Sequence, residues 1–261
     1  MPGTWEPPGK APEHPFLPLG AMVRAEHLLR PHLDDLAGSA AETRPGRTGY
    51  CIVDQAAVSQ PEEPVPAIQA ILARLGTRSL VLVGMMGAGK SSIGRKLSQV
   101  FDIPFVDADP EIEAAAGMTI PEIFATYGEP YFRAGEARVI ARLLDSGPQI
   151  LATGGGAFMR QETREAIAAK GLSIWLKADF EVLIRRVRRR TDRPLLKTAS
   201  PAATLKALIA ERYPIYALAD ITIWSRDVPH ETIVAEILAA LAERLGVVGE
   251  LPQPIMAGDE A

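Results

Sequence analysis

The 261-residue sequence contains no asparagine, a single cysteine and no long apolar run. Without asparagine the chain has no N-glycosylation site, and it lacks the catalytic-loop asparagine of protein kinases. Cys51 alone forms neither an intramolecular disulfide nor a cysteine-rich metal site, which fits a reducing compartment. No apolar stretch is long enough to span a bilayer, and the N-terminus lacks a basic start followed by an apolar run. We therefore expect a cytoplasmic protein that is neither exported nor membrane-bound.

An excess of positive charge is also missing. The chain has 28 Lys and Arg against 32 Asp and Glu, which gives a formal net charge of −4 and a pI of about 5.7. Proteins that bind nucleic acids usually carry a basic excess over the whole domain. The charge balance therefore argues against a nucleic-acid partner and favours a small-molecule one.

Prolines set the first part of the chain apart from the rest. Because proline removes a backbone donor and blocks helix interiors, we expect residues 1–66 to form a poorly ordered extension, with a short helix around residues 22–36. A partner-binding or DNA-binding arm is the alternative, but the segment shows neither a basic cluster nor two helices joined by a tight turn. We expect one folded domain over residues 67–248 and a flexible tail over residues 249–261.

From residue 67 onward, short apolar runs rich in β-branched residues alternate with amphipathic helical stretches. This alternation predicts an α/β fold with a parallel sheet that helices cover on both faces. An apolar face between Ile233 and Leu245, ending at Gly246, predicts a last helix that packs on the sheet. The five expected strands are residues 79–83, 104–106, 149–152, 172–176 and 221–224.

The first expected strand runs directly into a glycine-rich loop with the sequence GMMGAGKS. This segment satisfies the phosphate-loop pattern of Gly, four residues, Gly, Lys and then Ser or Thr. Around Gly87, Ala88 and Gly89 the backbone N–H groups can turn inward towards phosphate oxygens. Lys90 supplies a positive charge for the outer phosphates, Ser91 offers a hydroxyl to Mg²⁺, and the following helix directs its N-terminus at the anion. An ordinary glycine-rich turn is the alternative.

A phosphate loop indicates a nucleotide but not a reaction, since GTPases, ATPases and small-molecule kinases share it. A guanine-specific GTPase would carry an asparagine in its base-reading motif, and this chain has none. A motor ATPase is less favoured because no second module is evident. The sequence therefore favours a compact small-molecule kinase.

Asp107 and Asp109 follow the second expected strand, at the carboxyl edge of the sheet where such folds bind ligands. If the chain stays extended here, alternation directs both carboxylates to the same side. One carboxylate can then bind Mg²⁺, while the other can accept a hydrogen bond and a proton from a substrate hydroxyl. Asp109 directly before Pro110 equally fits a helix N-cap, so the residues alone leave both roles open.

Gly154, Gly155 and Gly156 follow the third expected strand at the same edge of the sheet. A triple glycine leaves backbone N–H groups open to a ligand, although a plain flexible turn has the same composition. Arg133 and Arg212 are candidates for a bidentate grip on a carboxylate or phosphate. A surface ion pair is the alternative for either arginine.

A dense run of arginines occupies residues 185–193. The alternatives for this run are a solvated helix end and a nucleic-acid patch, and the second lacks interleaved aromatic residues. The segment RTDRPLLK over residues 190–197 predicts a lid hinge, and we expect the lid to span about residues 188–200. A mobile basic lid would bring charge to a transferring phosphoryl group and exclude water from it.

Six segments, GMMGAGKSS, VDAD, YFR, ATGGGA, TDRPLL and ERYPIY, resemble the shikimate kinase family in this order over about residues 75–245. The resemblance implies ATP-dependent phosphorylation of the 3-hydroxyl of shikimate, on the route to chorismate and the aromatic amino acids. It implies a P-loop fold of the nucleoside-monophosphate-kinase-like type, with a five-stranded parallel sheet, a substrate-binding subdomain and a lid. We accordingly expect a monomer that takes shikimate and ATP, with Mg²⁺ as cofactor.

The resemblance also implies roles for individual residues. On the ATP side, Lys90 is the phosphate lysine, Ser91 and Asp107 are the Mg²⁺ positions, Arg193 is a catalytic lid arginine that reaches the phosphates, and Arg190 lies near adenine. The implied ATP-binding residues together are Gly87, Ala88, Gly89, Lys90, Ser91, Ser92, Arg190 and Arg193. Ser92 is a small departure, because the family commonly has threonine there.

On the acceptor side, the resemblance implies that Asp109 binds the shikimate hydroxyls and serves as the base. Arg133 and Arg212 correspond to the clamp on the shikimate carboxylate. The turn of Gly154, Gly155 and Gly156 corresponds to a backbone contact with the ring.

Two other functions compete with this interpretation. The first is another small-molecule kinase of the same fold, such as a gluconate or nucleotide kinase, which the RPLL segment and the Asp-Ala-Asp placement disfavour. The second is a regulatory protein that senses a ligand without turning it over. The complete set of Lys90, Ser91 and Asp107 argues against such a sensor.

Overall fold

The computed structural model of the protein describes residues 66–188 and 200–248. The helix predicted around residues 22–36, the lid arginines Arg190 and Arg193, and the tail of residues 249–261 lie outside these ranges. Among the helices of the described ranges, none combines the length and apolar character needed to cross a membrane.

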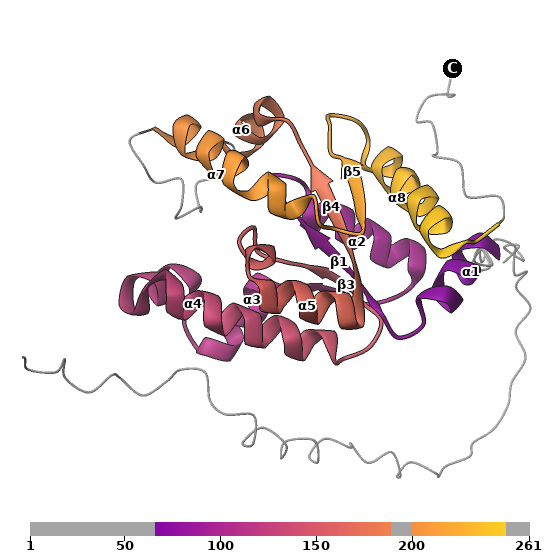
Figure 1. The fold of residues 1–261 in the computed structure, drawn as a ribbon, viewed down its shortest axis with the longest axis horizontal. Coiled ribbons are helices and arrows are strands. Elements are labelled where there is room, and N and C mark those ends of the chain that lie inside the picture. The colour runs from indigo at the N-terminus through magenta and orange to yellow at the C-terminus, as the bar shows by residue number, and fades with distance from the viewer. Residues whose placement is uncertain (1–65, 189–199, 249–261) are drawn as a thin grey trace, which may run out of the picture. The chain divides into compact units, whose positions relative to one another are not determined.

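Five parallel strands form a single sheet at the centre of the described domain (Figure 1). Their order across the sheet is β2-β3-β1-β4-β5, with every pairing parallel. The strands are β1 (Ser79–Val83), β2 (Phe105–Asp107), β3 (Ile150–Ala152), β4 (Gly171–Lys177) and β5 (Ile221–Trp224). The predicted α/β fold is confirmed, and all five predicted strands are present, β1 and β5 with the predicted bounds and the other three with ends shifted by one residue.

Helices lie on both sides of this sheet (Figure 1). The helices α1, α2 and α8 pack on one another, α4 packs against both α3 and α5, and α6 contacts α7. Their bounds are α1 (Pro66–Leu75), α2 (Lys90–Phe101), α3 (Ala108–Ala116), α4 (Ile120–Leu144), α5 (Gln161–Lys170), α6 (Phe180–Arg188), α7 (Pro201–Tyr216) and α8 (His230–Leu245), with a short 3₁₀ turn η1 (Ala157–Met159). The predicted last helix is α8, which ends at Gly246 in a left-handed cap.

Burial along the strands follows their place in the sheet. Every residue of β1 is buried, as expected for a central parallel strand covered on both faces. In the edge strand β5, Ile221 and Ile223 are buried whereas Thr222 and Trp224 point outward. The core therefore lies on both faces of the sheet, and the carboxyl ends of the strands stay available for a site.

The chain does not stay extended through Asp109, so that expectation was wrong. Strand β2 ends at Asp107 and α3 begins at Ala108, with Asp107 as its N-cap. The Asp107 side chain accepts a hydrogen bond from the backbone N–H of Asp109, 3.3 Å away, and so satisfies a donor of the first helical turn. The alternative of Asp109 as the N-cap is also wrong, because Asp109 lies inside this turn.

Helix α4 consists of two helical parts joined at Gly128. Gly128 has a φ of 80°, outside the helical region, and Pro130 follows it. The helix starts with a capping box in which Thr119 and Glu122 bond reciprocally to each other's backbone N–H. The kink sets the direction of the second part of α4, which carries Arg133.

Candidate active site

A cavity of about 810 Å³ opens at the carboxyl edge of the sheet. It is lined by the phosphate loop, α3, the start of α4, the glycine turn after β3, and residues of α6 and α8. Ligands of open α/β sheets bind at this edge. The location matches the predicted site, and the volume is in the range of small-molecule pockets.

The phosphate loop has the conformation that its glycines permit. Gly87 and Gly89 have φ values of 81° and 96°, which residues with a Cβ rarely adopt. No side chain caps the N-terminus of α2, and Lys90, Ser91 and Ser92 of its first turn line the cavity. The open N–H groups of this helix end form an anion site.

The ammonium group of Lys90 lies over the loop itself. Its Nζ donates to the carbonyl oxygens of Gly84, at 2.8 Å, and Met85, at 3.0 Å. These contacts hold the positive charge at the phosphate loop. A phosphate in the loop would be a stronger acceptor than either carbonyl, because it is charged.

Ser91 and Asp107 meet beside the loop. The Ser91 hydroxyl donates to Oδ2 of Asp107 over 2.8 Å, which links the first turn of α2 to the end of β2. A hydroxyl and a carboxylate are the hard oxygen ligands that Mg²⁺ prefers. Over residues 66–188 and 200–248 there is no cluster of three His, Cys, Asp or Glu side chains suited to a metal. This donor set therefore fits Mg²⁺ held jointly by the protein, phosphate oxygens and water.

The Asp109 carboxylate lies directly beside the glycine turn. A Cβ built on Gly154 would come within 3.2 Å of Asp109 Oδ1 and 2.6 Å of Glu136 Oε1. Gly154 therefore has no room for a side chain beside these two carboxylates. Asp109 lines both the large cavity and a smaller adjoining pocket of about 80 Å³.

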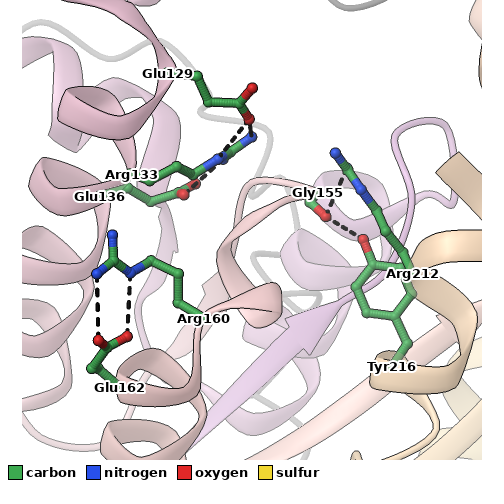
Figure 2. Close-up of polar contacts among 8 residues, drawn as sticks. All are labelled: Glu129, Arg133, Glu136, Gly155, Arg160, Glu162, Arg212 and Tyr216. Carbon is green, nitrogen blue, oxygen red and sulfur yellow. Dashed lines mark hydrogen bonds and ion pairs between the residues drawn. The ribbon is translucent and has the colours of Figure 1, made fainter.

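Arg133 lies between two glutamates of α4 (Figure 2). Its guanidinium donates to Glu136 over 2.7 Å and to Glu129 over 3.0 Å. A Cβ on Gly156 would lie 2.3 Å from the guanidinium carbon, so the arginine fills the space that this glycine leaves. Arg133 is thus ion-paired, but Glu136 is buried, so this pair differs from the surface ion pair offered as the alternative. The same guanidinium also lines the smaller pocket.

Arg212 reaches the same glycine turn from α7. Its Nη1 donates to the carbonyl oxygen of Gly155 at 3.1 Å, as Figure 2 shows. The side chain is 5% exposed, and its Nε has no hydrogen-bond partner within the described part of the chain. A buried donor without a partner is costly, so this position favours an incoming acceptor. The structure thus brings Arg133 and Arg212 together around one turn.

Glu136 was not predicted, although it lies at the centre of the acceptor side. It is 1% exposed, and its Oε1 has no hydrogen-bond partner among the residues described. Burial raises the pKa of its carboxyl group, and the neighbouring Arg133 offsets part of this effect. The sequence did hold a signal: Glu136, Val139, Ile140 and Leu143 share one helical face, so a carboxylate interrupts an apolar stripe.

Arg186 also lines the large cavity. From the sequence it was considered only as part of the arginine run over residues 185–193. Its Nη1 donates to the Ser225 hydroxyl at 2.9 Å, and Ser225 donates to the Ala88 carbonyl at 2.7 Å. This chain of bonds ties α6 and the end of β5 to the phosphate loop. Burial lowers the pKa of Arg186, and Arg185 lowers it further. Arg190 and Arg193 lie outside the described residues, so their places remain predictions.

The sheet order, the phosphate loop and the acceptor pocket beside it define a P-loop phosphotransferase. The profile of the family described as Shikimate kinase matches residues 86–242. A shikimate kinase of Rhodopseudomonas palustris is 62% identical over 189 residues, which cover 72% of this chain and 92% of that protein. One of Bradyrhizobium diazoefficiens is 66% identical over 175 residues, covering 67% of this chain and 84% of that protein. The chain belongs to the shikimate kinase family.

A solved structure agrees with this assignment. Shikimate kinase from Acinetobacter baumannii in complex with shikimate superposes with a TM-score of 0.63 at 34% identity. The match covers 66% of this chain and 97% of that chain. The fold and the family membership expected from the six sequence segments are confirmed.

Proposed function

We propose that this protein transfers the γ-phosphoryl group of ATP to the 3-hydroxyl of shikimate, giving ADP and shikimate 3-phosphate. The observation that carries the proposal is the convergence of Arg133 and Arg212 on one glycine turn beside the phosphate loop. A compact acceptor with one carboxylate and several hydroxyls needs an anion anchor at one end. The relatives named shikimate kinase support this choice of acceptor.

On the nucleotide side, the loop residues Gly87, Ala88 and Gly89 and the start of α2 surround the phosphates of ATP. Lys90 leaves its contacts with the loop carbonyls to donate to the outer phosphates. Ser91 and Asp107 would hold Mg²⁺, Asp107 through water. The ion would supply positive charge to neutralise the phosphate oxygens.

On the acceptor side, the guanidinium groups of Arg133 and Arg212 bind the shikimate carboxylate. The backbone of the glycine turn contacts the ring, and Asp109 accepts hydrogen bonds from the ring hydroxyls. The carboxylate anchor at one end then determines which hydroxyl faces the phosphate loop.

The reaction depends mainly on positioning and charge stabilisation. The 3-hydroxyl oxygen forms a bond to the γ-phosphorus while the bond to the β,γ-bridging oxygen breaks, and ADP leaves with that oxygen. The hydroxyl proton passes to the Asp109 carboxylate. In the segment outside the described residues, we assign Arg193 to the transferring phosphoryl group and Arg190 to the adenine side, within a lid over residues 188–200.

We further propose a cytoplasmic monomer whose folded domain spans residues 67–248. One chain supplies the phosphate loop, the hydroxyl–carboxylate pair and both arginines, so the site needs no group from a second copy. The net charge of −4 is consistent with small anionic substrates held by a few local cations rather than with a polyanion.

A substrate panel tests the function. ADP release from Mg·ATP is measured with shikimate, gluconate and AMP as separate acceptors. The proposal expects release with shikimate at least 100-fold faster than with either of the others. Preference for gluconate or AMP would show another kinase of this fold, and shikimate binding without any ADP release would show a sensor.

A further inference from the structure

Two side chains of α7 donate to the same backbone carbonyl of the glycine turn. Arg212 Nη1 reaches Gly155 O at 3.1 Å, and the Tyr216 hydroxyl donates to the same oxygen (Figure 2). Arg212 and Tyr216 are four residues apart and therefore share one face of the helix. The proposed acceptor-binding reaction uses the arginine but leaves the tyrosine unexplained.

Tyr216 is fully buried between the two loops of the site. Its ring packs against Trp175 and Phe158, with centroid distances of 5.9 and 6.5 Å, and its hydroxyl lies 3.9 Å from the sulfur of Met85 in the phosphate loop. Burial raises the pKa of Tyr216 to about 12, and Arg212 offsets part of the rise, so the hydroxyl keeps its proton at neutral pH. Because a thioether is a weak acceptor, the proton goes to the Gly155 carbonyl.

The orientation of the Gly155 carbonyl fixes the rest of the turn. In a planar trans peptide the C=O and the following N–H point in opposite directions, so a carbonyl held towards α7 directs the Gly156 N–H away from α7. Gly156 itself lies against the guanidinium of Arg133. The peptide between Gly155 and Gly156 therefore lies between the two arginines, and its orientation affects the positions of both guanidinium groups.

The turn also packs against the phosphate loop. A Cβ on Gly155 would lie 3.5 Å from the backbone nitrogen of Met86 and 3.6 Å from the carbonyl oxygen of Gly84. The glycine turn and the phosphate loop are thus separated by about the space of one methyl group, and the Tyr216 hydroxyl contacts both. Gly155 also lines the smaller pocket on the acceptor side.

We propose that Tyr216 is a positioning residue for the phosphoryl acceptor. Its hydroxyl holds the Gly155 peptide in the orientation in which the carbonyl accepts a hydrogen bond from Arg212. This bond fixes the position of the Arg212 guanidinium, and thereby the position of the acceptor's carboxylate relative to the phosphate loop. The role rests on the proposed function, because it concerns the binding of a carboxylate-bearing acceptor. Tyr216 does not touch the reacting atoms.

The substitution Tyr216→Phe removes the hydroxyl and keeps the buried ring. One lost hydrogen bond of ordinary strength corresponds to a rise of about 2- to 12-fold in the shikimate KM. The kcat and the KM for ATP should stay within about twofold of the wild-type values, because the phosphate loop keeps its own bonds. A purely structural role would lower the melting temperature and the active fraction without moving the shikimate KM.

Tyr213→Phe is the matched control. The Tyr213 hydroxyl also donates to a backbone carbonyl, that of Ala178, and its ring packs edge-on against Trp175 at 5.0 Å. The contacts found for Tyr213 within the described residues do not include the glycine turn. We therefore expect a similar loss of melting temperature in both variants but a changed shikimate KM only in Tyr216→Phe.

The outcomes separate the inference from the function. An unchanged shikimate KM in Tyr216→Phe, or the same rise in Tyr213→Phe, would overturn the positioning role while leaving the proposed function intact. A wild-type protein that releases no ADP with shikimate would contradict the proposed function, and the positioning role with it. A rise in the KM for ATP of equal size would show that the hydroxyl acts through Met85 instead, which also overturns the inference.

Discussion

At the scale of single residues, the positive charges of the two arginines on the acceptor side have different partners. The charge of Arg133 is paired with Glu136 and Glu129, whereas Arg212 bonds to a carbonyl and, within the described residues, forms no ion pair. A guanidinium that already bonds to carboxylates gains less from a further anion than one that does not. Arg212 therefore offers the stronger attraction for a carboxylate.

We predict that Arg133→Ala and Arg212→Ala both raise the shikimate KM, by about 10- to 100-fold for the loss of charge-assisted bonds. The larger rise is expected for Arg212→Ala. Steady-state kinetics at saturating ATP measure both values. Unchanged shikimate kinetics in Arg133→Ala would contradict the proposed clamp.

Lys90 is expected to act on the reaction rather than on the acceptor. Lys90→Ala removes the positive charge that the proposal places at the outer phosphates of ATP. This loss should lower kcat by at least about 10²- to 10³-fold. The shikimate dissociation constant, measured without nucleotide, should not change. Lys96→Ala is the control, because Lys96 lies on the same helix in an exposed ion pair with Glu231, and we expect it to retain activity.

Some of these residues could be found in the sequence and others could not. The phosphate loop is local, so its spacing alone identified Lys90 and Ser91. Asp107 was identified as a site residue, but its capping of α3 depends on a choice between extended and helical backbone that the residue types left open. Glu136 was missed because a glutamate in a helix is usually exposed, and only its burial shows otherwise.

At the scale of elements, the glycine turn after β3 contacts each of the charged side chains of the acceptor side. Gly154 faces two carboxylates, Gly155 bonds to α7, and Gly156 lies against Arg133. Gly154 and Gly156 therefore each have a steric reason to lack a side chain, whereas a Cβ on Gly155 would meet only ordinary contacts at 3.5 Å or more. A flexible turn, the alternative that the sequence left open, would not need such specific neighbours.

We predict that Gly156→Ala folds but binds shikimate poorly. Its backbone, with φ −100° and ψ −12°, accepts an alanine, while the new Cβ would lie 2.3 Å from the guanidinium carbon of Arg133. Because an arginine end can move, the expected effect is displacement of Arg133 and a rise of about tenfold or more in the shikimate KM, with little change in melting temperature. Gly155→Ala, where the nearest atom is 3.5 Å away, should raise the KM less. Equal KM values in the two variants would contradict this account.

The order of strands and helices could be predicted from the alternation of apolar runs, because parallel strands need crossover helices. The kink of α4 at Gly128 could not, since nothing local shows that the two helical parts pack as one element against α3 and α5. The same limit applies to the meeting of Arg133 and Arg212. They are far apart in the chain, and only the resemblance to the family predicted that they would meet.

At the scale of the whole molecule, the described residues hold the buried core, the phosphate loop and the acceptor pocket of one domain. The central strands are buried on both faces, and the phosphate loop and the acceptor pocket both lie at the carboxyl edge. A relative covered over 92% of its length aligns with 72% of this chain. Since the family profile matches residues 86–242, we expect the catalytic function to reside in the part of the chain that follows residue 65.

We predict that deletion of residues 1–60 leaves kcat and both KM values within about twofold of those of the full chain. The melting temperature should change little, because α1 and its packing on α8 are retained. Steady-state kinetics and thermal unfolding of the two proteins, side by side, measure this. Loss of activity in the shortened protein would show that the first segment takes part in catalysis.

The central claim is spatial: one chain holds the shikimate carboxylate between two arginines with a ring hydroxyl facing the phosphate loop. A crystal structure of the protein with shikimate and a non-hydrolysable ATP analogue tests it most directly. The account predicts the carboxylate within hydrogen-bond distance of Arg133 and Arg212, and the 3-hydroxyl between Asp109 and the γ-phosphate. Shikimate bound with its carboxylate away from both arginines would contradict the account.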